Sequence, residues 1–465
     1  MKRLFPWLFI VFLSASLSAQ NLPEIISGPM PGNVDMRSAQ VWAEIKTGSS
    51  PNLVYWEKSN AGERKIALAG YSDFMGFRTA KYTLTALEPA TTYQYALISG
   101  NNKNGRLPVS GELTTRSNWL YREQLPDFSF LTGSCAYFNE PKYDRIYTDY
   151  ATLDKPAAPY GLDSSIFQTM ARTPASFMLW LGDNWYTREP DYYSEYGLNY
   201  RASHDRAQPI LQGFLKAMPH YAIWDDHDFG PNDCDKSYHL KESSRQVFMN
   251  YWLNPSYGES GKGIYTRFVY GDAEFFLLDD RSFRSNDNMA DTINSFPNQE
   301  KRMFGPEQMD WLKNALLGSK ATFKIIATGS QVLNPVSLFD CFRKFPAEYN
   351  ELMSFLTIEK IDGVVFLTGD RHHSEIIRVP RTGTYPLYDI TCSPLTSGTH
   401  KFFGAEARNQ YRVLGIDQKQ NFGKISFTGT PAERRMKVEF IGVNGESLGD
   451  WSVTAQQLKT PKVNR

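Results

Sequence analysis

From residue 128 to residue 393, the sequence repeats one pattern that few folds can satisfy. Short apolar runs rich in β-forming residues end in small or acidic residues, and more polar stretches separate one run from the next. Runs that are apolar throughout are typical of strands buried on both faces, which implies a sheet covered on either side. The runs are FSFLTGSC (128–135), SFMLWLGD (176–183), HYAIWDD (220–226), AEFFLLDD (273–280), TFKIIATGS (322–330), DGVVFLTGD (362–370) and YDITCS (388–393).

Helix-like segments lie between several of these runs. In one of them, Pro306 and Glu307 stand in the first turn, where proline lacks only an unused N–H and a carboxylate favours the helix dipole. Residues 198–212 are expected to begin a charged, solvated helix, with a lid as the alternative. Strands that alternate with helices predict α/β layers, whose ligand sites gather at the carboxyl ends of the strands. The predicted helices are 165–173, 209–218, 243–253 and 305–317.

Residues 22–116 have a different texture. Pro89 turns the chain before the last strand-like segment, and Tyr93 can return its hydroxyl to the backbone just upstream, as in the tyrosine corner of Greek-key sandwiches. We expect an all-β sandwich of the fibronectin type III kind, and the alternative is that these hairpins begin one large sheet. A polar linker follows at 114–126. Segments that alternate apolar and polar residues, as half-buried antiparallel strands do, are 39–45, 52–58, 79–85 and 92–98.

The first 19 residues have the three parts of a secretory signal peptide. MKR supplies positive charge, LFPWLFIVFLSASL is apolar, and small residues precede Gln20 at the expected cleavage site. The alternative is an N-terminal membrane anchor, but the apolar run is shorter than the roughly 20 residues of a spanning helix. No other stretch could cross a bilayer. We therefore expect a secreted or periplasmic protein with no transmembrane anchor after cleavage.

Charge and cysteine content exclude some classes of protein. The 50 basic residues balance 50 acidic ones, and no basic run occurs, so no nucleic-acid partner is indicated. Four cysteines are too scattered for a disulfide framework. If one pair forms in an oxidising compartment, Cys234 and Cys341 are the candidates, because Cys135 and Cys392 lie in the motifs described below.

The heptapeptide WDDHDFG (224–230) places three aspartates around one histidine. Carboxylates this close repel one another unless they are solvated, protonated or neutralised by cations. A solvated acidic turn is the plain alternative. Other strand ends also carry residues that can bind metals, which favours neutralisation by bound cations over a solvated turn. The complete set is Cys135; Asp183 and Tyr186; Asp225, Asp226 and His227; Asp279 and Asp280; and Asp370, His372 and His373.

These residues are expected to converge, because α/β topology brings successive strand ends to one edge of the sheet. Taken singly, an aspartate after a strand more often caps a helix, and a lone histidine or cysteine more often packs. Together they could not all remain ionised without bound cations. Two ions about 3.5–4 Å apart, bridged by one carboxylate, would activate a water and clamp both ends of a phosphoryl displacement.

The order of the motifs adds a resemblance to a known family. GSCAY, LGDNWY, WDDHDFGPND, ATGSQV, LTGDRHHSE and DITCSPLTSG resemble the alkaline phosphatase D family, the PhoD-like metallophosphatases of the calcineurin-like phosphoesterase superfamily. The resemblance covers nearly all of the chain that follows the predicted signal peptide (1–19). It implies a fibronectin III-like domain at 22–116, followed by a four-layer α/β/β/α metallophosphoesterase catalytic domain at 125–455.

The resemblance also implies a set of metal ligands. Asp183 would bridge the metals, and Tyr186 stands where purple acid phosphatases place a phenolate on ferric iron. The chain departs from the wider superfamily at three points: Cys135 replaces the D-x-H motif, Asp226 stands where asparagine usually ligates, and Asp370 replaces the first histidine of G-H-x-H. The implied ligands are Cys135, Asp183, Tyr186, Asp226, Asn232, Asp370 and His372.

These departures bear on the cofactor and on the catalytic residues. Fewer imidazoles and more oxygen donors favour Fe³⁺ with Ca²⁺, as the family suggests, with Mn²⁺, Zn²⁺ or Mg²⁺ as alternatives. His227 matches a substrate-facing histidine that can donate a proton to the leaving group. Arg281 and Arg371 can each contact two phosphate oxygens, and the alternative for Arg281 is a structural ion pair.

The predicted function is a secreted metal-dependent hydrolase of small phosphate esters, of the alkaline phosphatase type. A phosphodiesterase or phospholipase with the same site is the first alternative, and pocket width, set by loops 137–165, 184–208 and 333–360, would separate the two. The second alternative is a non-enzymatic, calcium-stabilised surface binding protein. His227 argues against it, because imidazole is a poor ligand for calcium.

Overall fold

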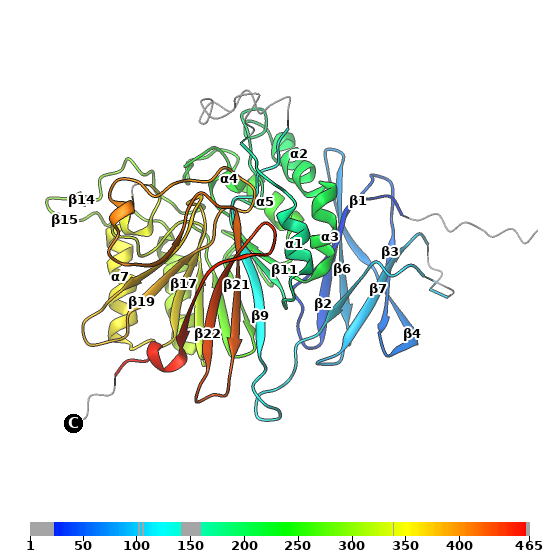
Figure 1. Ribbon diagram of the computed structural model, residues 1–465. Coiled ribbons are helices and arrows are strands. Elements are labelled where there is room, and N and C mark those ends of the chain that lie inside the picture. Colours follow the sequence, from blue (N-terminus) through cyan, green and yellow to red (C-terminus); the bar gives the residue numbers. More distant parts are fainter. Residues whose placement is uncertain (1–22, 101–102, 105–106, 141–159, 338, 462–465) are drawn as a thin grey trace, which may run out of the picture.

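The computed structural model describes residues 23–461, except 101–102, 105–106, 141–159 and 338. An all-β part comes first along the chain, and a larger part that mixes helices and strands follows it (Figure 1). No helix within the described ranges is long and apolar enough to cross a membrane. The predicted signal peptide, residues 1–19, lies outside the described residues.

The N-terminal part is a sandwich of two four-stranded sheets. Side chains from both sheets, including Val41 and Tyr82 from one and Leu53 and Tyr95 from the other, form one buried core. The hydroxyl of Tyr93 accepts the N–H of Glu88 at 2.8 Å, as predicted for a tyrosine corner. The all-β prediction is confirmed, and the alternative of one large sheet is wrong. The strand order of the first sheet is β1 (Ile25–Gly32), β2 (Ser38–Ile45), β6 (Phe77–Thr85), β5 (Ala69–Phe74). The strand order of the second sheet is β4 (Asn60–Ala67), β3 (Asn52–Glu57), β7 (Thr92–Ile98), β8 (Gly111–Thr114).

Two larger sheets form the centre of the second part. One has the order β11 (His220–Ile223), β10 (Met178–Leu181), β9 (Phe128–Gly133), β21 (Asn421–Thr428), β22 (Arg435–Gly442), β23 (Ser447–Thr454). The other has the order β12 (Thr266–Tyr270), β13 (Ala273–Leu277), β16 (Phe323–Ala327), β17 (Val364–Thr368), β19 (Leu387–Thr391), β18 (Ser374–Val379), β20 (Arg412–Ile416). A small exposed hairpin consists of β14 (Thr292–Ile293) and β15 (Phe296–Pro297).

Helices cover the outer faces of the two sheets, as Figure 1 shows for α1 and α3 on one side and α7 on the other. The described α-helices are α1 (Ile166–Arg172), α2 (Glu195–Arg206), α3 (Pro209–Ala217), α4 (Asp226–Phe229), α5 (Lys241–Tyr251), α6 (Gly305–Gly318) and α7 (Pro346–Ile358). Short 3₁₀ helices lie at Phe342–Lys344, Glu406–Arg408 and Ala455–Leu458. The order of layers is therefore α/β/β/α, which confirms the predicted fold class.

The apolar runs are buried on both faces because their side chains alternate between two cores. Along β9 and β10, Phe130 and Leu179 face the second sheet and join the core between the two sheets, where Phe130 packs edge-on against Phe275 of β13. Leu131 and Trp180 face the opposite way and pack with residues of α1, α3 and α5. The three parallel strands β9, β10 and β11 thus end together at one covered edge.

Candidate metal centre

Side chains from four strand ends meet at the carboxyl edge of the two sheets. Cys135 follows β9, Asp183 follows β10, Asp226 follows β11 at the start of α4, and His372 lies between β17 and β18. Since β9, β10 and β11 are parallel neighbours, the residues after them are brought side by side. The seven-stranded sheet adds the end of β17 to the same edge.

Two glycines allow these strand ends to approach closely. Gly182 has a φ of 90°, and a Cβ placed there would lie 2.7 Å from the Cβ of Asp225. A Cβ on Gly369 would lie 2.6 Å from the carbonyl oxygen of Leu181 and 2.7 Å from Ser134. The small residue before each acidic residue of the two GD motifs is therefore required by packing of one strand end against another.

Four of the predicted ligands have left-handed backbone. The φ angles are 62° at Cys135, 51° at Asp183, 66° at Asp370 and 55° at His372. Each such residue costs about 1–2 kcal/mol, because its Cβ approaches the following carbonyl oxygen. Backbone strain of this kind concentrates at functional sites, where the surrounding structure enforces it.

The first group of donors consists of Cys135, Asp183 and His372, whose ligand atoms all lie within 4.8 Å of one another. The Cys135 Sγ is 3.5 Å from Asp183 Oδ2. The hydroxyl of Tyr186 donates to the same Asp183 oxygen at 3.0 Å and lies 3.3 Å from His372 Nε2. With Tyr186, this first group therefore contains four of the seven predicted ligands.

The second group shares Asp183 with the first. Ligand atoms of Asp183, Asp226 and His227 also lie within 4.8 Å of one another. The His227 ring stacks on the Tyr186 ring at 4.1 Å between centroids, which joins the two groups. Within the described residues, Asp183 Oδ1 is buried and has no hydrogen-bond partner. One carboxylate with a spare oxygen between two donor groups is the arrangement that a bridging ligand needs.

The electrostatics of the cluster are unfavourable for the protein alone. Burial, followed by the charges of Cys135 and Asp226, raises the pKa of Asp183 well above its usual range. Burial and the charge of Asp370 raise the pKa of the Cys135 thiol to about 11. At Asp226 burial opposes ionisation, but the charges of His227 and Arg281 hold its pKa below the usual value. Cations would relieve this repulsion and release the protons.

The donor set fits such cations. It combines carboxylates, a phenol, a thiol and an imidazole, which suit borderline or trivalent ions better than magnesium alone. The Nδ1–H of His372 donates a hydrogen bond to the Gly398 carbonyl at 2.7 Å, which orients the imidazole so that Nε2 faces Tyr186. Burial, with repulsion from His400 second, lowers the pKa of His372 well below its usual value.

Residues that the sequence did not indicate support this cluster. The Ser393 hydroxyl donates to Cys135 Sγ at 3.1 Å and accepts the backbone N–H of His372 at 3.0 Å. The His400 ring stacks on His372 at 4.5 Å. Ser393 lies in the DITCSPLTSG motif, so the motif gave a signal for this segment although not for the role of the serine.

Asp370 and Asn232 lie outside both donor groups. The carbonyl of Asp370, rather than its carboxylate, faces Cys135 Sγ at 3.5 Å, and burial raises the pKa of the carboxyl to about 7. The Asn232 amide donates to Asp233 at 2.8 Å, and the Asp233 N–H donates to Asp226 at 2.7 Å. The ligand roles of Asp370 and Asn232 remain predictions.

The two predicted phosphate-binding arginines are buried in ion pairs. Arg281 contacts Asp225 and Asp340, the latter at 2.9 Å, and reaches within 4.0 Å of Asp226. Arg371 donates to Glu406 at 2.6 Å. The structural ion pair considered for Arg281 is therefore present, and contact of either residue with phosphate remains a prediction.

Asp279 also follows a strand, but its carboxylate has a structural role. It accepts the indole N–H of Trp224 at 2.8 Å and the backbone N–H of Ile264 at 2.9 Å. These bonds anchor the end of β13 to the segment before α4. Carboxylates whose oxygens are occupied in this way have a structural function.

The suggested disulfide between Cys234 and Cys341 is wrong. All four cysteines lie among the described residues, and each is a free thiol. The two sulfurs contact different parts of the backbone: Cys234 Sγ faces the carbonyl of Asp226, whereas Cys341 Sγ faces that of Asn334. Their spacing in sequence could not show this, because a disulfide depends on Cα separation and Cβ direction.

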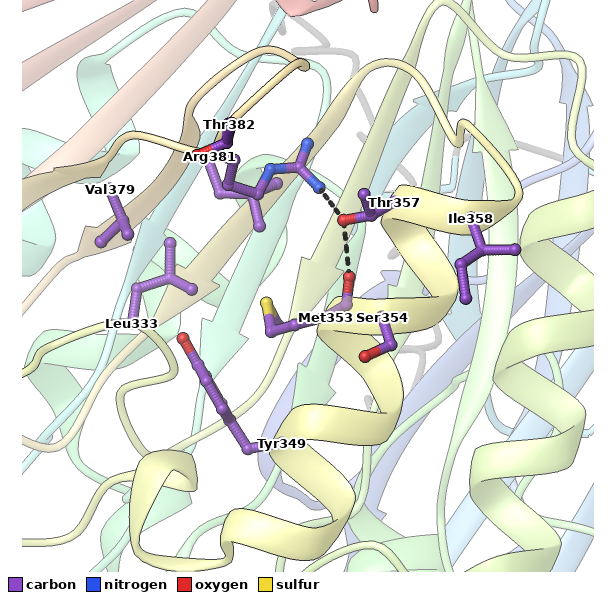
Figure 2. A pocket seen from close by; sticks show the side chains of 10 residues that line it. Leu333, Tyr349, Met353, Ser354, Thr357, Ile358, Val379, Arg381 and Thr382 are labelled. Atoms are coloured by element: carbon purple, nitrogen blue, oxygen red, sulfur yellow. Dashed lines mark hydrogen bonds between the residues drawn. The ribbon is translucent and has the colours of Figure 1, made fainter.

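A separate groove of about 500 Å³ lies beside α7 (Figure 2). Its lining is mostly apolar, and Arg381 reaches across to the hydroxyl of Thr357. It contains none of the predicted ligands. The lining residues are Leu333, Tyr349, Met353, Ser354, Thr357, Ile358, Val379, Arg381, Thr382 and Leu387.

The layered fold and the shared carboxylate between two donor groups define a protein of the metallophosphoesterase type. The chain belongs to the PhoD-like phosphatase family, whose family model matches residues 156–438. It is 24% identical over 339 residues to alkaline phosphatase D from Bacillus subtilis (strain 168), an alignment that covers 62% of this chain and 52% of that protein. The chain thus spans about half the length of this curated relative.

Two solved structures share the fold. A structure of PhoD superposes with a TM-score of 0.72 at 18% identity, covering 96% of this chain and 93% of that one. The purple acid phosphatase PPD1 from yellow lupin (Lupinus luteus) seeds superposes with a TM-score of 0.68 at 11% identity, covering 96% and 78%. The resemblance to the PhoD-like family predicted from the motifs is confirmed.

Proposed function

We propose that this chain is a secreted or periplasmic, metal-dependent phosphoric ester hydrolase of the alkaline phosphatase type. The observation that carries the proposal is the position of Asp183, a buried carboxylate with one unpartnered oxygen, between two groups of metal-binding side chains. Membership of the PhoD-like phosphatase family supports phosphate esters as the substrate class.

The proposed division of the chain follows the two parts of the fold. Residues 1–19 would direct secretion, residues 22–116 would form a fibronectin-like domain, and residues 125–455 would form the catalytic domain. All the proposed ligands and catalytic residues lie in the last range. The sandwich would then support the enzyme without contributing to its chemistry.

The proposed cofactor is a dinuclear metal centre, with Fe³⁺ and Ca²⁺ as the first choice. Cys135, Tyr186 and His372 would hold one ion, Asp226 with Asn232 would hold the other, and Asp183 would bind both. Asp370 completes the proposed set. A thiol and a phenol on the same side favour the trivalent ion there, because both must lose a proton to bind. When bound, the metals would supply Lewis-acid charge and an activated water.

The reaction then needs a proton donor and a binding site for phosphate. Water supplies the oxygen that phosphorus gains, the bond between phosphorus and the alcohol oxygen breaks, and that oxygen takes up a proton. His227 is the proposed donor, because its ring lies at the second donor group and stacks on Tyr186. Arg371 and Arg281 are the proposed phosphate contacts, held in place by Glu406 and Asp340.

The test of this proposal is the variant Asp183→Asn. We expect hydrolysis of 4-nitrophenyl phosphate to fall by more than about 100-fold, beyond the effect of losing an outer partner of a ligand. Elemental analysis should show loss of metal, while circular dichroism should show an unchanged fold. The matched control is Asp310→Asn on the exposed face of α6, which should keep full activity and metal content.

Full activity of Asp183→Asn would overturn the bridging role. Comparison of 4-nitrophenyl phosphate with bis(4-nitrophenyl) phosphate separates a monoesterase from the diesterase alternative, since the second ester group must also fit. We expect the higher kcat/KM for the monoester. A preference for the diester would move the assignment to the phosphodiesterase class.

A further inference from the structure

Two exposed phenylalanine rings lie beside Arg371, next to the donor cluster. The Phe339 ring lies 4.5 Å from the Arg371 guanidinium, and the Phe403 ring lies edge-on to Phe339 at 6.1 Å. Phe339 is 44% exposed and Phe403 is 48% exposed. Single exposed apolar residues are common on protein surfaces. Two exposed rings in contact with each other, next to the buried Arg371, instead indicate a binding surface.

The segment that carries Phe403 is fixed to the proposed site. The N–H of His400 donates to the carbonyl of His372 at 2.8 Å, and the two imidazoles stack at 4.5 Å. Three residues after Phe403, Glu406 accepts from Arg371 at 2.6 Å. The segment 400–406 therefore runs along the strand end that carries a proposed ligand, with Phe403 exposed between two fixed points.

The segment that carries Phe339 is fixed from the other side. The next residue, Asp340, accepts from Arg281 and pairs with Arg284, each at 2.9 Å. Arg281 in turn reaches Asp226, a member of the second donor group. The two rings are thus held at the edge of the cluster by separate anchors, one toward each donor group.

Arg371, whose guanidinium lies beneath the Phe339 ring, has one N–H donor without a partner in the described part of the chain. Its Nη2 is used by Glu406, but its Nε–H is buried and has no hydrogen-bond partner among the described residues. A buried, unpaired guanidinium N–H costs free energy unless a ligand accepts it. A phosphate oxygen would satisfy this donor, and the alcohol portion of the same ester would then extend past the guanidinium toward the rings.

We infer that Phe339 and Phe403 contact the alcohol portion of the substrate, so that the site prefers phosphate esters of aromatic or otherwise apolar alcohols to esters of small polar alcohols. This inference rests on the proposed function. It names Phe339 and Phe403 as residues that determine specificity, while the reacting atoms are held by others. Aromatic faces suit this task because they bury apolar surface at little cost in side-chain entropy.

The test uses two phosphonates, which bind without being hydrolysed. Inhibition constants of phenylphosphonate and methylphosphonate are measured against 4-nitrophenyl phosphate hydrolysis by the wild type and by Phe403→Ala. Phe403 is chosen because it does not stack on Arg371 itself. We expect the wild type to prefer phenylphosphonate and Phe403→Ala to lose about fivefold of that preference.

Matched variants complete the test. Phe403→Tyr keeps the ring and should keep the preference, as should Phe296→Ala, which removes a 74% exposed ring from the β14–β15 hairpin. Equal binding of the two phosphonates by an active wild type, or an unchanged preference in Phe403→Ala, would overturn the inference. A wild type with bound metal that hydrolyses no phosphate ester would instead overturn the proposed function.

Discussion

His227 is proposed to donate a proton, whereas the residues around it are proposed to bind metal. We expect His227→Ala to lower kcat for 4-nitrophenyl phosphate by about 10²–10⁴-fold, the usual contribution of proton transfer. Metal content should be unchanged, because the other donors remain. The control is His239→Ala, an exposed histidine twelve positions further along the chain, which should keep the wild-type rate. Loss of metal from His227→Ala would make the residue a ligand instead.

The proposed ligand roles of Tyr186 and Cys135 can be tested without an activity assay. If iron occupies the first donor group, the purified protein should absorb visible light through charge transfer from a phenolate or thiolate. We expect Tyr186→Phe or Cys135→Ser to remove that band, while Tyr55→Phe in the sandwich leaves it unchanged. Elemental analysis of the same samples identifies the metals. A colourless protein with two equivalents of zinc would contradict the iron assignment.

The sequence predicted the centre of this site better than its surroundings. Cys135, Asp183 and His372 each follow an apolar run, so strand order alone was enough to bring them together. Ser393 and His400 could not be assigned in the same way, because their roles depend on contacts between loops far apart in the chain. The position of a side chain after a strand is a local property, whereas its hydrogen-bond partners are not.

Helices α6 and α7 are joined by one carboxylate that can be tested. Glu348 in α7 accepts the backbone N–H groups of Met303, Phe304 and Gly305 at 2.6–2.9 Å, where α6 begins. These N–H groups have no partner within the helix, so Glu348 caps it. We expect Glu348→Ala to lower the free energy of unfolding by about 2–3 kcal/mol, measured by urea denaturation.

The control for this prediction lies in the same helix. Glu351 pairs with Lys313 of α6 at 2.7 Å but is substantially exposed, and such pairs contribute less than about 1 kcal/mol. Glu351→Ala should therefore be nearly neutral. An equal loss of stability in both variants would show that Glu348 acts through general packing of α7 and not through the cap.

The same two helices show how far secondary structure could be predicted. The helix predicted at 305–317 is observed as α6, and all seven apolar runs contain strands. Residues 333–360 were expected to be a loop but contain α7. The helix was difficult to predict because Leu352 and Leu356 are its only fully buried apolar residues. A stripe this short carries little periodic signal.

Residues 198–212 are mostly helical, as expected, but the expectation that their charged residues are solvated is wrong. This range covers most of α2 and the start of α3, and charged residues of α2 are buried. Arg201 contacts Asp191 at 2.8 Å, Asp205 at 3.1 Å and Glu140 at 2.9 Å. Charged residues normally indicate a solvated face, and only tertiary pairing makes their burial possible.

The sandwich and the α/β part that follows it are joined through a buried polar interface. Trp42 of β2 donates its indole N–H to the carbonyl of Asn250 at 2.8 Å. From the same strand, Glu44 accepts the hydroxyl of Ser203 in α2 at 2.6 Å and that of Tyr251 in α5 at 3.2 Å. A carboxyl group buried between two parts of the molecule makes their association sensitive to pH.

The pKa of Glu44 determines whether stability rises or falls with pH. Burial raises its pKa from 4.5 to about 7, against the opposing effects of Ser203, Tyr251 and Arg206. The folded carboxyl therefore keeps its proton at pH values where the unfolded one has lost it. The contribution of Glu44 to the free energy of unfolding is fully present below pH 4.5. It decreases by about 3 kcal/mol in total as the pH rises to about 7.

Glu44→Gln removes the titrating group while keeping an acceptor for Ser203 and Tyr251. We expect the variant to match the wild type in urea unfolding at pH 4 and to exceed it by about 3 kcal/mol at pH 8, since only the wild type must bury a charge there. Glu24→Gln, which changes an exposed carboxyl paired with Lys46, should follow the wild-type pH profile. A Glu44→Gln protein that is less stable than the wild type at pH 8 would mean that the ionised carboxylate, compensated by Arg206, holds the two parts together.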